Sequence, residues 1–117
     1  MTTTKQRPSE QITETVTSWP RVEAGPGRRG EFSFRVNGKE IGHLHGDHAA
    51  HFGFPREIGA ELREAGRVGP HPVNPHSPKM ASRRIETDED VRDVIELMRE
   101  NYLRIVAGGE SRSSGRD

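Results

Sequence analysis

The pair Asn37-Gly38 constrains this chain more than any other short segment, because it separates two stretches of strand-like sequence. Both central positions of a type I′ turn need a positive φ, and Asn-Gly is the pair that such turns prefer most strongly. Before the pair, residues 31–36 alternate polar and apolar side chains with the two-residue period of a half-buried strand. The sequence therefore predicts a β-hairpin in which residues 39–45 form the returning strand.

A two-residue turn also fixes which residues face each other across the hairpin. In a regular ladder it places Phe34 opposite Ile41 and Phe32 opposite His43. Alternate residues of a strand lie on the same face of a sheet. We therefore expect His43 and His45 to lie on the apolar face, together with both phenylalanines.

The next turn allows two registers for the strand predicted at residues 48–54. With a two-residue turn, His48 faces His45, and the alternating apolar residues of the new strand continue the apolar face. With a three-residue turn the parity reverses, and His51 joins His43 and His45. The apolar pattern favours the two-residue turn.

Three other segments have the 3.6-residue apolar period of amphipathic helices, namely residues 9–19, 55–65 and 87–106. The last of them begins with Thr87 and a run of acidic residues, which suits a helix N-terminus. A further short strand is predicted at residues 80–85. Together these elements predict an α+β fold in which a small antiparallel β-meander packs against two to three helices in a single domain.

Composition and charge set the limits of that domain. The chain has 117 residues, of which only 29% are hydrophobic, so we expect a small core in residues 9–106 and disordered polar tails at residues 1–8 and 107–117. It has no cysteine and no apolar run long enough for a membrane span, which favours a cytoplasmic protein without membrane contact. Its 18 basic and 18 acidic residues argue against a nucleic-acid-binding protein, which normally carries an excess of basic charge.

Histidine is the residue type that carries most of the functional signal. Four of the six histidines lie within nine residues, in the pattern His43-x-His45-x-x-His48-x-x-His51. Neutral imidazole is a good ligand for Zn, Cu, Fe and Ni, so a transition metal is one candidate occupant, with His43, His45 and His48 as the candidate ligands. His71 stands between two prolines, which hold its backbone extended and suit a preset acid–base or ligand-binding group.

The order of several short motifs resembles that of the luciferase-domain family. These motifs are Glu40-Ile41-Gly42-His43-Leu44-His45, then Phe54-Pro55, then His71-Pro72, then Arg84 ahead of an acidic helix start. The family consists of small bacterial and archaeal proteins that share a domain with fungal luciferase. The resemblance covers most of residues 18–105.

The resemblance implies a small-molecule ligand and a pocket lined by histidines. Fungal luciferase oxidises a hydroxylated pyrone with molecular oxygen and needs no metal or organic cofactor, so the expected cofactor here is none. On this chain the implied pocket residues are His43, His45, His51 and His71, with Arg84 as a looser match. The chain is the bare domain and has Lys79-Met80 where an aromatic residue is expected, so light emission itself is not expected.

A specific site follows from these residues. Phe32 and Phe34 beside the two strand histidines would form a mostly apolar ligand-binding wall with a few polar groups, as small-molecule pockets have. His43, His45 and His71 are the expected catalytic residues of an oxygenase-like enzyme in which a histidine base deprotonates an electron-rich substrate.

Two other classes of function remain open from the sequence. The first is a metal-binding module built on the histidine cluster. The second is an interaction domain that binds a protein or a nucleic acid through the pairs Arg28-Arg29 and Arg83-Arg84. The sequence carries no signal for the oligomeric state.

Overall fold

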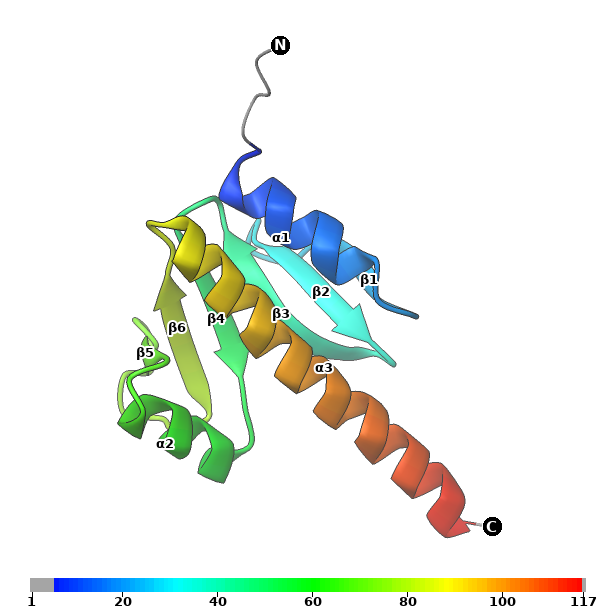
Figure 1. The fold of residues 1–117 in the computed structure, drawn as a ribbon. Helices are drawn as coiled ribbons and strands as arrows, with labels where there is room; N and C mark the ends of the chain where they lie inside the picture. Colours follow the sequence, from blue (N-terminus) through cyan, green and yellow to red (C-terminus); the bar gives the residue numbers. More distant parts are fainter. Residues whose placement is uncertain (1–5, 117) are drawn as a thin grey trace.

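The computed structural model describes the backbone of residues 6–116 and the side chains as far as Gly108. The elements follow one another as α1 (Pro8–Thr17), β1 (Glu23–Pro26), β2 (Phe32–Val36), β3 (Lys39–His45), β4 (Ala49–Gly53), α2 (Arg56–Glu64), β5 (Gly69–Pro70), β6 (Met80–Arg84) and α3 (Asp88–Arg116) (Figure 1). All strand pairs are antiparallel, and the sheet order is β1-β2-β3-β4-β6-β5. The predicted α+β class and the single domain are confirmed.

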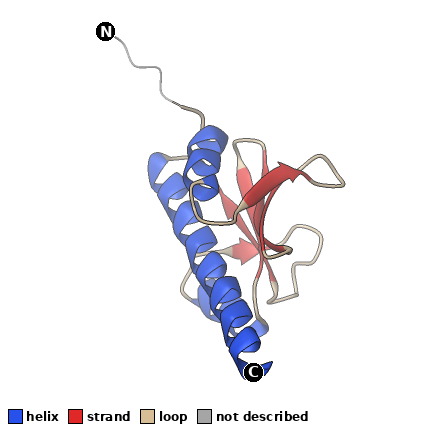
Figure 2. Cartoon of the chain, turned by 90° about the vertical axis from the view of Figure 1, so that its right-hand side faces the viewer, coloured by secondary structure: helices blue, strands red, loops and turns tan. Residues whose placement is uncertain are grey.

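Helices α1 and α3 lie side by side across one face of the sheet (Figures 1 and 2). Within the described residues no helix covers the opposite face, which we call the open face (Figure 2). Helix α2 lies at the end of β4 and β6. No helix in the described part of the chain is both long enough and apolar enough to cross a membrane.

The hydrophobic core fills the space between the sheet and helices α1 and α3. Its largest fully buried side chains are Ile12, Val16, Phe34, Val36, Ile41, Leu44, Leu97, Met98 and Val94. These residues recur at helical spacing in α1 and α3 and at alternate positions of β2. The small core predicted from the composition is therefore a single layer of apolar side chains between the sheet and these two helices.

The first hairpin starts as predicted and then departs from the regular ladder. Asn37 and Gly38 both have positive φ, at 53° and 77°, and Arg35 faces Glu40. A β-bulge follows, because Phe34 pairs with Gly42 and leaves Ile41 without a partner on β2. The predicted pairing of Phe34 with Ile41 is therefore wrong.

The bulge places consecutive residues of β3 on the helical side. Ile41 is fully buried in the core. A Cβ at Gly42 would lie 3.0 Å from Phe52 and 3.1 Å from Met98, so glycine lets this strand pack closely against α3. From Gly42 onward every side chain of β3 points to the face opposite to that predicted by a regular hairpin.

Asn101 of α3 supports this bulge from the helical side. Its buried Nδ2 donates hydrogen bonds of 2.9 Å to the carbonyl of Ile41 and 3.0 Å to the carbonyl of Gly53. A backbone carbonyl at a bulge loses its ladder partner, and an unpaired buried carbonyl destabilises the fold. Asn101 therefore satisfies two strand carbonyls that the sheet itself leaves available.

The second turn contains three residues and not the favoured two. His45 pairs with Ala49, and His43 pairs with His51, so residues 46–48 form the turn. The prediction that His48 faces His45 is therefore wrong, and the alternative register is the observed one. The change of parity at the bulge and the change at this turn together keep Ala50 and Phe52 in the core.

The helices at the two ends of the chain reach into the segments predicted as tails. Helix α1 begins at Pro8, within the predicted N-terminal tail, and residues 1–5 of that tail lie outside the described residues. At the other end α3 continues to Arg116, through most of the segment predicted as a tail at residues 107–117. Residue 117 lies outside the described residues.

We expect the substitution Asn101→Ala to destabilise the protein by about 2–3 kcal/mol, because it leaves buried carbonyls of β3 and β4 without a donor. The matched control is Leu103→Ala, which removes a half-exposed side chain two residues further along the same helix. Urea denaturation of the two variants measures the difference. Equal midpoints for both variants would show that the bulge does not depend on Asn101.

Candidate functional site

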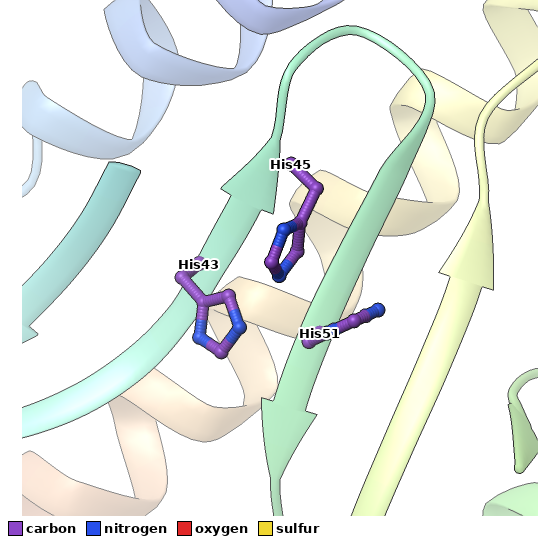
Figure 3. Close-up of side chains that lie close together, drawn as sticks. All are labelled: His43, His45 and His51. Atoms are coloured by element: carbon purple, nitrogen blue, oxygen red, sulfur yellow. The ribbon is translucent and has the colours of Figure 1, made fainter. Parts of the chain in front are cut away.

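Three histidines from neighbouring strands meet on the open face of the sheet. His43 and His45 come from β3, and His51 comes from β4, directly opposite His43 (Figure 3). The ring centroids are 4.9 Å apart for His43 and His45, 5.3 Å for His43 and His51, and 4.3 Å for His45 and His51. One ring nitrogen of each lies within 4.8 Å of one ring nitrogen of the other two. We call these three residues the histidine cluster.

His71 extends the cluster from the loop that follows β5. Its ring centroid lies 4.5 Å from that of His51, and its side chain is buried. The structure therefore brings together the four histidines that the family resemblance implied, His43, His45, His51 and His71. Two histidines lie apart from them, since His48 is exposed in the turn after β3 and His76 is exposed in the loop before β6.

A glutamate and a serine orient His43. The Nδ1 of His43 lies 3.1 Å from Oε2 of Glu40, and the hydroxyl of Ser33 donates a 2.8 Å hydrogen bond to Oε1 of the same carboxylate. Burial raises the pKa of Glu40, but hydrogen bonds from His43 and Ser33 outweigh that effect and hold the pKa below its ordinary value. An ionised carboxylate only accepts, so Nδ1 of His43 carries the proton and its Nε2 has a free electron pair.

The sequence prediction missed Glu40 and Ser33 as members of the site. In a regular strand, residues 40 and 43 point to opposite faces, because the side-chain period is two. The bulge at Ile41 removes one step of that alternation and brings Glu40 and His43 to the same face. Only a prediction that included a bulge in β3 would have placed Glu40 and Ser33 beside His43.

Burial keeps the innermost histidines neutral. Desolvation and, in decreasing order, the neighbouring His45, His71 and His43 together lower the pKa of His51 to about 4. Desolvation also lowers the pKa of His71, with smaller contributions from His43 and His45. Near neutral pH, both rings are therefore uncharged.

The loop that carries His71 is held by backbone and side-chain contacts. The backbone N–H of Val73 donates a 3.1 Å hydrogen bond to Nδ1 of His71, so the proton of the neutral ring lies on Nε2. Farther along the loop, the guanidinium of Arg63 in α2 donates to the carbonyls of Pro75, Ser77 and Met80 at 3.1, 2.7 and 3.1 Å. These contacts fix a proline-rich segment that has almost no regular structure of its own.

The structure contradicts the predicted apolar wall of the site. Phe34 is buried in the core beneath the helices, and Phe32 pairs with Leu44 on the same helical face. Phe32 is 36% exposed and lines an open groove of about 600 Å³ between α1 and strands β2 and β3. The bulge at Ile41 is the reason, because it moves the histidines to the face opposite both phenylalanines.

The structure also separates the two arginines of β6. Arg83 points to the helical side and forms ion pairs with Asp90 at 2.8 Å and Asp93 at 2.6 Å in α3. Arg84 is exposed and pairs with Ala49, which itself pairs with His45, so it lies on the open face beside the cluster. Of the two, Arg84 is therefore available to a ligand on the histidine side.

The family model of the luciferase domain matches residues 38–101, which is more than half of the chain. The chain belongs to this family. This chain has no significant match among the curated proteins and none among the solved structures.

The part of the luciferase domain that the match covers contains all four histidines of the site. It begins in the first hairpin turn and ends at Asn101, so it includes Glu40, the histidine cluster, His71 and Arg84. Strands β1 and β2 and helix α1 lie before it. The matched segment therefore holds both the bulge in β3 and the asparagine that supports it.

The depressed pKa of His51 predicts that acid destabilises this luciferase domain before its carboxylates titrate. The unfolded chain takes up a proton at His51 near its ordinary pKa of 6.5, but the folded chain does so only near about 4. The stabilisation that neutral His51 contributes is therefore complete above about pH 6.5, and it is lost as the pH falls from about 6.5 to about 4. His43, His45, His71 and Glu40 face the same ring and contribute to its pKa.

Denaturation at pH 7.5 and pH 4.5 tests this expectation with His51→Gln and the exposed control His48→Gln. The free energy of unfolding should depend less on pH in His51→Gln than in the control. An identical pH dependence in both variants would contradict a buried neutral His51.

The histidines at the two ends of the site, His43 and His71, should have opposite tautomers. Long-range ¹H–¹⁵N NMR should place the proton of His43 on Nδ1, beside Glu40, and that of His71 on Nε2. In Glu40→Ala the proton of His43 should redistribute toward Nε2, with His71 unchanged. A His43 that is protonated mainly at Nε2 in the native protein would contradict the pairing with Glu40.

Proposed function

We propose that this luciferase domain binds a small, weakly acidic organic molecule on its open face and promotes the reaction of that molecule with oxygen without a cofactor. The observation that carries the proposal is the contact series from Ser33 through Glu40 to His43. Membership of the luciferase domain family supports a small-molecule ligand at the level of the family.

The proton acceptor in this proposal is Nε2 of His43. Hydrogen bonding of Nδ1–H to the carboxylate of Glu40 fixes the tautomer and stabilises the imidazolium that forms when the ring accepts a proton. Ser33 holds the other oxygen of the same carboxylate and so limits its rotation. A histidine oriented by a carboxylate is a common general base.

The groups around His43 suit an anion more than a neutral ligand. Arg84 lies on the open face at the β6 side, and Arg35, which pairs with Glu40, lies at the β2 side. His71 supplies a neutral N–H donor, since its Nδ1 already accepts from the backbone. Cations and fixed donors near a site of developing negative charge stabilise that charge.

Deprotonation prepares the ligand for oxidation in this scheme. The proton passes to His43, and the resulting electron-rich anion transfers electrons to molecular oxygen, which is reduced as the ligand is oxidised. Phenolic and hydroxypyrone compounds have the required acidity and electron density. Light emission is not part of the proposal.

Binding and oxygen uptake with the chelator-treated full chain test this function. The probes are 4-hydroxy-2-pyrones and catechols, measured by calorimetry and with an oxygen electrode. We expect His43→Ala to lower oxygen uptake by about 10²–10⁴-fold, the usual contribution of a general base. The exposed control His48→Ala should keep the native rate.

Uptake of oxygen that persists in His43→Ala would overturn the role of His43. A folded native protein that binds none of these compounds would overturn the ligand class. Circular dichroism of each variant separates either outcome from loss of the fold.

A further inference from the structure

We infer that His43, His45 and His51 together form a binding site for one divalent transition-metal ion. The inference is independent of the proposed function, because it concerns the protein without an organic ligand. It rests on the geometry of the histidine cluster, on the contacts of each ring, and on the exposure of the site.

The distances suit a single ion. The three ring nitrogens lie within 4.8 Å of one another. Three nitrogens that each bind one zinc ion at about 2.0–2.1 Å, at tetrahedral angles, lie about 3.4 Å apart. Small side-chain rotations bring the rings to that spacing, and the exposed side chain of His45 is free to make the largest of them.

The backbone already holds the three residues in position. His43 and His51 are direct partners in the antiparallel pair of β3 and β4, and His45 is two residues further along the same face. Ligands placed on adjacent strands need no loop to close around the ion. The site therefore exists before the metal binds, and binding orders only side chains.

Glu40 gives His43 the outer contact that metal-binding histidines usually have. Such a histidine almost always donates its second ring N–H to a carboxylate, a carbonyl or a water molecule. The Nδ1 of His43 lies 3.1 Å from Oε2 of Glu40, which leaves Nε2 for the ion. The hydrogen bond from Ser33 to the other oxygen of this carboxylate holds Glu40 in place beside His43.

His71 is excluded as a fourth ligand by its hydrogen bond. Its Nδ1 accepts the backbone N–H of Val73, and the proton of the neutral ring occupies Nε2, so neither nitrogen offers a free electron pair. His48, a candidate ligand from the sequence, lies in the turn outside the cluster. The ligand set is therefore three imidazoles.

Three neutral imidazoles define the kind of ion and the kind of site. Imidazole suits Zn²⁺, Cu²⁺, Fe²⁺ and Ni²⁺, whereas Mg²⁺ and Ca²⁺ prefer oxygen ligands. Three protein ligands leave at least one coordination position open, as catalytic zinc sites do. Here that position faces solvent, on the side where His45 is exposed.

A bound ion and the proton-acceptor role of His43 exclude each other. Both use the electron pair on Nε2 of His43, so a metal-loaded protein cannot accept a proton there. The metal would therefore block the proposed reaction at the step in which His43 accepts the proton.

Titration of tag-free, chelator-treated full chain with Co²⁺ and Zn²⁺ tests the site. We expect one ion per chain, visible absorption bands of histidine-bound Co²⁺ and, in the titration with diamagnetic Zn²⁺, larger NMR shifts of the three cluster rings than of His71. His45→Ala should weaken Zn²⁺ binding by about 10–100-fold or more, and Glu40→Gln should weaken it by a similar factor through His43. The matched controls His48→Ala and His76→Ala remove exposed histidines and should bind as the native chain does.

Two results would overturn the metal site. The first is no stoichiometric binding at micromolar Zn²⁺ by the folded native chain. The second is binding that His45→Ala and His43→Ala leave unchanged, since His45 is exposed and its loss does not disturb the core. Neither result bears on pyrone binding, which is measured in the presence of chelator, so the metal site and the proposed function fail separately.

Discussion

The hydrogen bonds from Asn101 to the carbonyls of Ile41 and Gly53 connect the longest helix to the two strands that carry the histidine cluster. Ile41 is the extra residue of the bulge, and its carbonyl gains a donor from α3. Because strand side chains alternate, one extra residue reverses the direction of every side chain after it. Loss of this bulge would turn His43 and His45 into the core and Leu44 out of it.

The two faces of the sheet have different chemistry because of that reversal. The helical face is a dry layer that contains Phe34, Leu44 and Phe52. The open face carries ionisable side chains from four neighbouring strands, in contact with solvent at its edges and buried at His51. A site on this face keeps its polar groups out of the core, where unpaired polar atoms would be costly.

The site combines a fixed frame with partly exposed groups. His43 is oriented by a carboxylate, and His51 and His71 are buried and neutral, whereas His45 is exposed. The same arrangement that suits a proton acceptor also suits a metal ligand, because both functions need a neutral imidazole with a free nitrogen. The two occupants that we propose both use Nε2 of His43, and neither needs a rearrangement of the fold.

Local sequence determined the turn at Asn37-Gly38, the amphipathic helices and the importance of the histidines. Turn geometry and helical periodicity are properties of neighbouring residues, so these predictions needed no knowledge of the rest of the chain. The tertiary structure decided the bulge at Ile41 and the three-residue turn after His45. The bulge packs against α3 and is held by Asn101, which is 60 positions from Ile41 in the sequence. The bulge and the longer turn together place His43, His45 and His51 on the face opposite Phe32 and Phe34, and no local pattern encodes them.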